Sequence, residues 1–148
     1  PARAHVVMNS PASRAVWGLV GGRKFDLGGM KVAVGAVERD YAVILVTTMD
    51  GKPLETTRRA LLTAVGSATN PGMKWNAART SVGRDWGEGP AEVNGIAADV
   101  TWPQRGARMY ALDGRGQRQG EIAAADGAAG TRFVLSAAHR TLWYEIVW

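Results

Sequence analysis

The chain has 148 residues and no cysteine, which excludes a disulfide framework, a thiolate nucleophile and a cysteine-ligated zinc site. Hydrophobic residues make up 46% of the sequence and charged residues 21%, a composition typical of a globular domain with its own core. The longest apolar runs, such as residues 41–46, are far shorter than the roughly 18 residues that span a bilayer, so no membrane partner is expected.

The net charge of +5 comes from 14 arginines and four lysines, set against 13 acidic residues. A basic chain can bind nucleic acid, but nucleic-acid binders usually gather their charge on one face or helix. Here only Arg58 and Arg59 are adjacent, and the other arginines are scattered. Binding to nucleic acid or another polyanion is therefore the less favoured hypothesis for the positive charge.

Short strand-like runs separated by turn residues begin the chain. The first two runs, 4–8 and 14–20, are separated by a turn cluster of Asn, Ser and Pro. Residues 24–27 and 30–34 flank Gly28-Gly29, which predicts a tight hairpin because glycine readily adopts positive φ. Residues 41–48 are rich in β-branched residues and apolar on both faces, which predicts a central strand packed from both sides.

The next segment, residues 54–65, fits two structures. Its leucines and Val65 match a helical period, and alanine is a good helix former. A strand from about Arg58 to Val65 fits the spacing of the flanking turns better. We favour the strand, with a short helical turn at residues 53–56.

Residues 66–90 form a long loop in which several glycines and prolines prevent a regular helix. Long loops in compact domains tend to be either functional or disordered, and two tryptophans here argue against disorder. An indole can cover the apolar face of a sugar ring while amide, carboxylate and guanidinium groups bind its hydroxyls. The predicted carbohydrate-binding residues are Trp75, Trp86, Asn76, Arg79 and Asp85. The competing interpretation is that both indoles fold back over the open end of the fold.

Five further strand candidates follow the loop, at residues 96–102, 108–112, 120–124, 131–135 and 141–147. Two of the connections between them, Asp113-Gly114 and residues 126–130, have the composition of hairpin turns. About ten short strands at intervals of roughly 8 to 12 residues predict an all-β fold, an antiparallel β-sandwich. We assign residues 1–148 to this single domain.

The remaining tryptophans are interpreted from their position in the strand-like runs. Trp17, Trp143 and Trp148 alternate with other apolar residues, so they are predicted to lie in the core. Trp102 ends a run directly before Pro103, where a side chain can face outward, and is a secondary candidate for binding.

The sequence gives little support to an enzyme. Glycoside hydrolysis needs two carboxylates at a set separation, whereas Asp85, Glu88 and Glu92 lie on a glycine-rich loop where a solvated role is favoured. A Gly-x-Ser-x-Gly elbow is absent, and the two histidines do not suggest a hydrolase triad. No acidic cluster has metal-ligand spacing, so neither a metal site nor a cofactor is predicted, and a structural calcium ion stays open.

Several strings along the chain belong to a recognisable pattern: 45–55 (LVTTMDGKPLE), 60–66 (ALLTAVG), 70–76 (NPGMKWN), 86–90 (WGEGP), 110–114 (YALDG) and 139–145 (HRTLWYE). Together they resemble the C-terminal β-sandwich domain that follows a (β/α)-barrel in many bacterial clan A glycoside hydrolases. The resemblance spans nearly the whole chain, and its strings are more specific together than singly.

The resemblance implies a non-catalytic, carbohydrate-binding accessory module of a secreted, polysaccharide-degrading glycoside hydrolase, located outside the cell or in the periplasm. Its implied partners are a plant or algal polysaccharide and the catalytic domain of the parent enzyme. The start at Pro1 and the β-rich end at residues 145–148 fit a module excised from a larger enzyme. The alternative is a structural domain that packs on the catalytic barrel without binding sugar.

Overall fold

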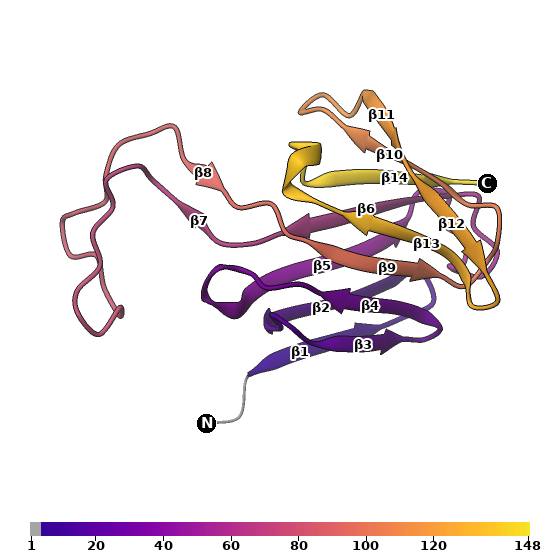
Figure 1. Ribbon diagram of the computed structural model, residues 1–148, viewed down its shortest axis with the longest axis horizontal. Helices are drawn as coiled ribbons and strands as arrows, with labels where there is room; N and C mark the ends of the chain where they lie inside the picture. Colours follow the sequence, from indigo (N-terminus) through magenta and orange to yellow (C-terminus); the bar gives the residue numbers. More distant parts are fainter. Residues whose placement is uncertain (1–3) are drawn as a thin grey trace.

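The computed structural model describes residues 4–148 and confirms the predicted all-β fold, with two antiparallel sheets packed face to face (Figure 1). The larger sheet has seven strands in the order β1 (His5–Asn9), β2 (Ser13–Leu19), β5 (Tyr41–Thr48), β6 (Arg59–Val65), β14 (Trp143–Val147), β10 (Arg108–Leu112) and β11 (Arg118–Ile122). The smaller sheet has five, in the order β12 (Ala124–Gly127), β13 (Gly130–Leu135), β9 (Ala98–Trp102), β4 (Met30–Val34) and β3 (Lys24–Leu27).

Helical structure is limited to two single 3-10 turns within the described residues 4–148, η1 (Glu38–Asp40) and η2 (Ala137–His139). None of this part of the chain forms a helix that is long and apolar enough to span a membrane. A short ribbon of β7 (Ala68–Thr69) and β8 (Glu92–Val93) stands apart from both sheets.

The predicted turns form as the sequence indicates. Leu27 pairs with Met30 across Gly28 and Gly29, whose φ angles of +64° and +92° are the positive values that a two-residue hairpin requires. The Gly29 amide also donates to the Asp26 carboxylate at 2.8 Å. Within residues 54–65, Arg59–Val65 form the favoured strand, β6, after a turn in which the Thr57 amide donates to the Pro53 carbonyl at 2.9 Å.

Two features raise the number of strands above the predicted count of about ten. The strand expected at 120–124 is two strands, because β11 ends at Ile122 in the larger sheet and β12 begins at Ala124 in the smaller one. The long loop also contributes its own two-residue strands, β7 and β8. Turn residues mark where strands end, but they carry no information on which sheet the next strand joins.

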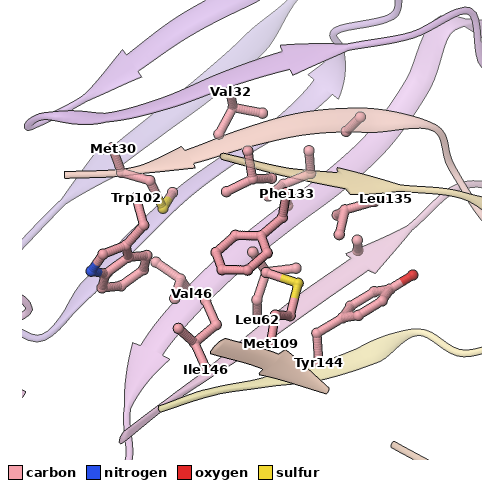
Figure 2. Close-up of a cluster of buried hydrophobic side chains, with 14 of the residues drawn as sticks. Met30, Val32, Val46, Leu62, Trp102, Met109, Phe133, Leu135, Tyr144 and Ile146 are labelled. Atoms are coloured by element: carbon pink, nitrogen blue, oxygen red, sulfur yellow. The ribbon is translucent and has the colours of Figure 1, made fainter. Parts of the chain in front are cut away.

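The core lies between the two sheets (Figure 2). Trp102 and Phe133 come from the smaller sheet, while Tyr144 and Ile146 come from the larger one, and all four are buried. Burial of the Tyr144 phenol raises its pKa to about 12. Because apolar side chains of alternate residues fill this space from both sheets, hydrophobic burial is the main stabilising force of the sandwich.

Strand β5 is covered on one face only. Ile44 and Val46 point into the sandwich and are buried, whereas Val43 and Leu45 point the other way and are half-buried. The prediction that this strand is packed from both sides is therefore wrong within the described chain. The outer face of the larger sheet is nevertheless apolar, since strand register aligns the following six side chains on it: Trp17, Val43, Leu45, Leu61, Val65 and Trp143.

Three tryptophans lie elsewhere than the sequence predicts. Trp102 has only 1% of its surface exposed, because β9 keeps its inward alternation up to its last residue, so the outward-facing placement is wrong. Trp143 was predicted to be core but is 39% exposed, since Tyr144 and Ile146 take the inward positions of β14. Trp17 is also outside the core, half-buried on the outer face. Trp148 packs against the core as predicted, with its ring centroid 5.2 Å from that of Trp102.

Many of the scattered arginines are held in ion pairs with carboxylates: Arg14 with Glu55, Arg39 with Glu38, Arg59 and Arg118 with Glu145, Arg108 with Glu121, and Arg132 with Asp99. Glu145 is buried on the outer side of β14, 2.6 Å from Arg118 and 2.5 Å from Arg59. Burial alone would raise the pKa of the Glu145 carboxyl, but hydrogen bonds from these two guanidinium groups outweigh it and lower the pKa. Much of the arginine charge is therefore balanced locally.

Candidate functional site

Residues 68–93, named the arm here, project beyond the ends of both sheets (Figure 1). The β7–β8 ribbon forms its base, where Ala68 pairs with Val93 and Thr69 with Glu92. The arm leaves the sandwich after β6 and returns to it before β9, as the sequence predicts for the long loop. Both candidate tryptophans of that loop lie on it.

Hydrogen bonds across the arm hold its two sides together. The Lys74 amide donates to the Asp85 carbonyl at 3.0 Å, and the Glu88 amide donates to the Pro71 carbonyl at the same distance. The two sides approach so closely at Gly87 that a Cβ atom there would lie 2.2 Å from the Pro71 oxygen. Glycine is therefore required at this position, and the arm has a defined conformation despite its few strand residues.

The tip of the arm is a tight loop closed by Asn76. Its side-chain oxygen accepts from the Thr80 amide at 2.9 Å, and its side-chain nitrogen lies 3.1 Å from the Thr80 hydroxyl. Its own backbone amide donates to the Ser81 carbonyl at 2.9 Å. Arg79 has a positive φ of 54° within this loop, and its amide donates to the Asn76 carbonyl. The Asn76 amide group thus shapes the site in addition to lining it.

A hollow of about 360 Å³ lies on the arm between its two sides. Its lining residues are Lys74, Trp75, Asn76, Ser81, Val82, Gly83, Arg84 and Asp85. The structure thus brings together three of the five predicted site residues, Trp75, Asn76 and Asp85. Trp86 and Arg79 lie on the same arm but do not line the hollow.

The two arm tryptophans differ in their surroundings. Trp75 is 36% exposed, and the guanidinium carbon of Arg39 lies 4.7 Å from its ring centroid in a cation–π contact. Trp86 is 60% exposed, and its carbonyl accepts from the Asn70 side chain at 3.0 Å. The interpretation that both indoles cover the open end of the sandwich is wrong for Trp86, which is largely exposed on the projecting arm, whereas Trp75 contacts Arg39 of η1.

Some residues of this site could not be found from the sequence. Arg39 belongs to η1, 36 positions before Trp75, and nothing in its local sequence connects it to the arm. Ser81 lines the hollow only because Asn76 closes the tip loop. Lys74 and Arg84 adjoin the predicted residues, so their place in the lining follows from that proximity.

The groups that line the hollow suit contacts with a polar ring-shaped ligand. An indole, two cationic side chains, one carboxylate, one amide and one hydroxyl surround the hollow, a set that can stack on a ring and exchange hydrogen bonds with hydroxyl groups. Within residues 4–148, no three histidine, aspartate or glutamate side chains gather closely enough to hold a metal ion.

Comparison with known proteins gave no match to a protein-family model, to a curated protein or to a solved structure.

Proposed function

We propose that this chain is a non-catalytic accessory module of a secreted polysaccharide-degrading glycoside hydrolase, and that its arm binds carbohydrate. The observation that supports the proposal is the hollow on the arm, where the Trp75 indole stands beside Lys74, Ser81, Arg84 and Asp85. Sugar-binding sites combine these same two elements, an aromatic face for the ring and polar side chains for its hydroxyls.

The position of the arm suits a long ligand such as a polysaccharide. It projects beyond the ends of both sheets, so an extended polysaccharide can reach it without meeting the sheets (Figure 1). Trp86, the more exposed indole, offers a second aromatic surface outside the hollow. Because Arg39 covers one side of Trp75, the sugar would stack on the opposite side of that ring.

The first test is affinity electrophoresis of the purified chain through gels that contain individual plant or algal polysaccharides. We expect retardation on at least one polysaccharide. Trp75→Ala and Trp86→Ala should each weaken binding about fivefold to tenfold, because one aromatic stack contributes about 1 kcal/mol or slightly more. The matched control is Trp143→Ala, which removes an indole of similar exposure from the outer face and should leave retardation unchanged.

The salt dependence of retardation distinguishes carbohydrate binding by the arm from polyanion binding. Retardation by stacking and neutral hydrogen bonds should persist at moderate salt, whereas binding through arginine charge should fall steeply as salt rises. Absence of retardation on every polysaccharide, or equal retardation of the native chain and both arm variants, would contradict carbohydrate binding by the arm.

A second candidate function is docking on a neighbouring protein domain through the outer face. The observation that favours it is the apolar character of that face, where Leu45, Val65 and Trp143 occupy positions that solvent-facing sheets usually give to polar residues. This candidate corresponds to a structural domain that packs on a catalytic barrel. It uses a surface separate from the arm.

The docking hypothesis predicts that the chain alone exposes an apolar surface. The native chain should bind a hydrophobic dye, and Leu45→Lys should reduce the dye fluorescence while the far-UV circular dichroism stays unchanged. Val134→Lys is the control, because Val134 is an exposed apolar residue of the smaller sheet. A native chain that binds no dye, or a loss of dye binding in both variants, would argue against this role.

A further inference from the structure

The two sheets of the sandwich have four edge strands, β1 and β11 in the larger sheet and β12 and β3 in the smaller one. An edge strand presents backbone N–H and C=O groups to solvent and is a template for pairing with another chain. Proteins usually prevent such pairing with charged side chains, bulges or very short strands. The four edges of this chain differ in such protection.

Three edges are protected. Strand β11 carries Arg118 and Glu121, and its register with β10 shifts between Ala111 and Leu112. Strand β3 has only four residues, two of which are Lys24 and Asp26. Strand β12 is also four residues long and contains an aspartate and a glycine. Each of these edges resists the addition of a further strand.

Strand β1 lacks these protections. Its sequence, HVVMN, contains no aspartate, glutamate, lysine, arginine, proline or glycine. It pairs with β2 in unbroken register over all five residues. Val6 and Val7 are about half exposed, at 48% and 47%, and Met8 is exposed as well. In Figure 1 the strand lies at the margin of the molecule, and among residues 4–148 no strand pairs with its outer side.

We propose that β1 is a self-association edge, which pairs antiparallel with β1 of a second copy of the chain and joins the two larger sheets into one. A two-fold axis at Val7 would place Val7 opposite its equivalent, and Val6 opposite Met8 of the second copy. Such an isologous contact is self-complementary, because each residue of one copy meets the symmetric position of the other. Apolar and β-branched pairs across strands are stabilising in antiparallel sheets.

The side chains of β1 favour a second copy as its occupant. The chain carries a net charge of +5, so most contacts between copies would bring positive charges together. Strand β1 itself carries none of those arginines or lysines. The Arg23 guanidinium lies 2.9 Å from His5 Nδ1, at the end of the strand and not at the axis at Val7. The pairing would also be continuous with the apolar outer face, because Val6 lies beside Trp17 in the strand register.

The test is sedimentation velocity of the whole chain over a concentration range from about 1 µM to about 1 mM, since a five-residue strand pair gives a small and weak interface. We expect a monomer–dimer equilibrium. Val7→Lys should raise its dissociation constant at least tenfold, because two ammonium groups would face each other across the axis. Gln119→Lys adds the same charge to the protected edge strand β11 and should leave the dissociation constant unchanged.

A charge-reversal experiment distinguishes lost pairing from lost folding. Val7→Lys and Val7→Glu should each be monomeric alone, while an equimolar mixture should sediment as a heterodimer. A native chain that stays monomeric over the whole range overturns the proposal. It is also overturned by a dimer that Val7→Lys leaves intact, and a dimer lost in Leu45→Lys instead would assign the contact to the outer face.

Discussion

Trp102→Ala is expected to lower the free energy of unfolding by about 3–5 kcal/mol, the usual loss when a buried large aromatic residue is truncated. Trp102 is almost fully buried, and its ring packs against Trp148. Its indole N–H also donates to the Gln104 side chain, so the substitution leaves both a cavity and an unpaired amide oxygen. Urea unfolding followed by circular dichroism measures the loss as a lower midpoint with an unchanged slope.

Trp143→Ala is the matched control for this prediction, because it removes the same side chain from a strand of the facing sheet. We expect a loss of about 1 kcal/mol or less, since much of the Trp143 surface is already exposed to water. If Trp102→Ala does not fold, the milder Trp102→Leu should still fold and lose more stability than Trp143→Ala. Equal losses at the two positions would contradict the burial that the structure assigns to them.

The contrast between Trp102 and Trp143 marks the limit of prediction from local sequence. Both tryptophans alternate with apolar residues, and on β14 both faces of the strand carry apolar or paired residues. The orientation of each side chain depends on strand register, which is set by neighbouring strands that are distant in sequence. Local features such as Pro103 therefore could not decide which tryptophan is buried.

The distinction between local sequence signals and contacts distant in sequence also applies to the fold and the candidate site. Glycine pairs and aspartate-glycine turns act within a few residues, so the hairpins and the all-β class could be predicted. Local sequence could also indicate the arm as a long loop with two tryptophans. It could not reveal the contact of Arg39 with Trp75, because that contact depends on where η1 lies relative to the arm.

The apolar outer face shows how a wrong prediction can still be informative. The composition of β5 indicated cover on both sides, but the described chain supplies cover on only one. The residues themselves, Val43 and Leu45, remain suited to a buried environment. Carbohydrate binding on the arm uses a surface separate from the outer face and from β1. Docking on the outer face and pairing at β1 adjoin each other, and substitutions at Leu45 and at Val7 distinguish them.

Gly130 lies where the start of β13 comes very close to the backbone at the end of β9. It begins β13 with a φ of +118°, and its neighbour Thr131 pairs directly with Trp102 of β9. A Cβ atom at Gly130 would lie 1.8 Å from the Trp102 carbonyl oxygen and 2.8 Å from the Pro103 carbonyl carbon. Both are backbone atoms at the end of β9, and they cannot move aside as the end of a flexible side chain can.

Gly130→Ala is therefore expected to lower the free energy of unfolding by about 2–5 kcal/mol, because the positive φ and the backbone contact each add strain. Gly127→Ala is the control in the same hairpin: Gly127 pairs with Gly130, has no atom within 4 Å of its would-be Cβ and does not have a positive φ. The free energy of unfolding of Gly127→Ala should be unchanged or slightly higher than that of the native chain, since alanine reduces the entropy of the unfolded chain. Thermal unfolding of both variants measures the difference. Equal melting temperatures would mean that the β12–β13 hairpin shifts freely relative to β9, and that this contact does not fix the register of the smaller sheet.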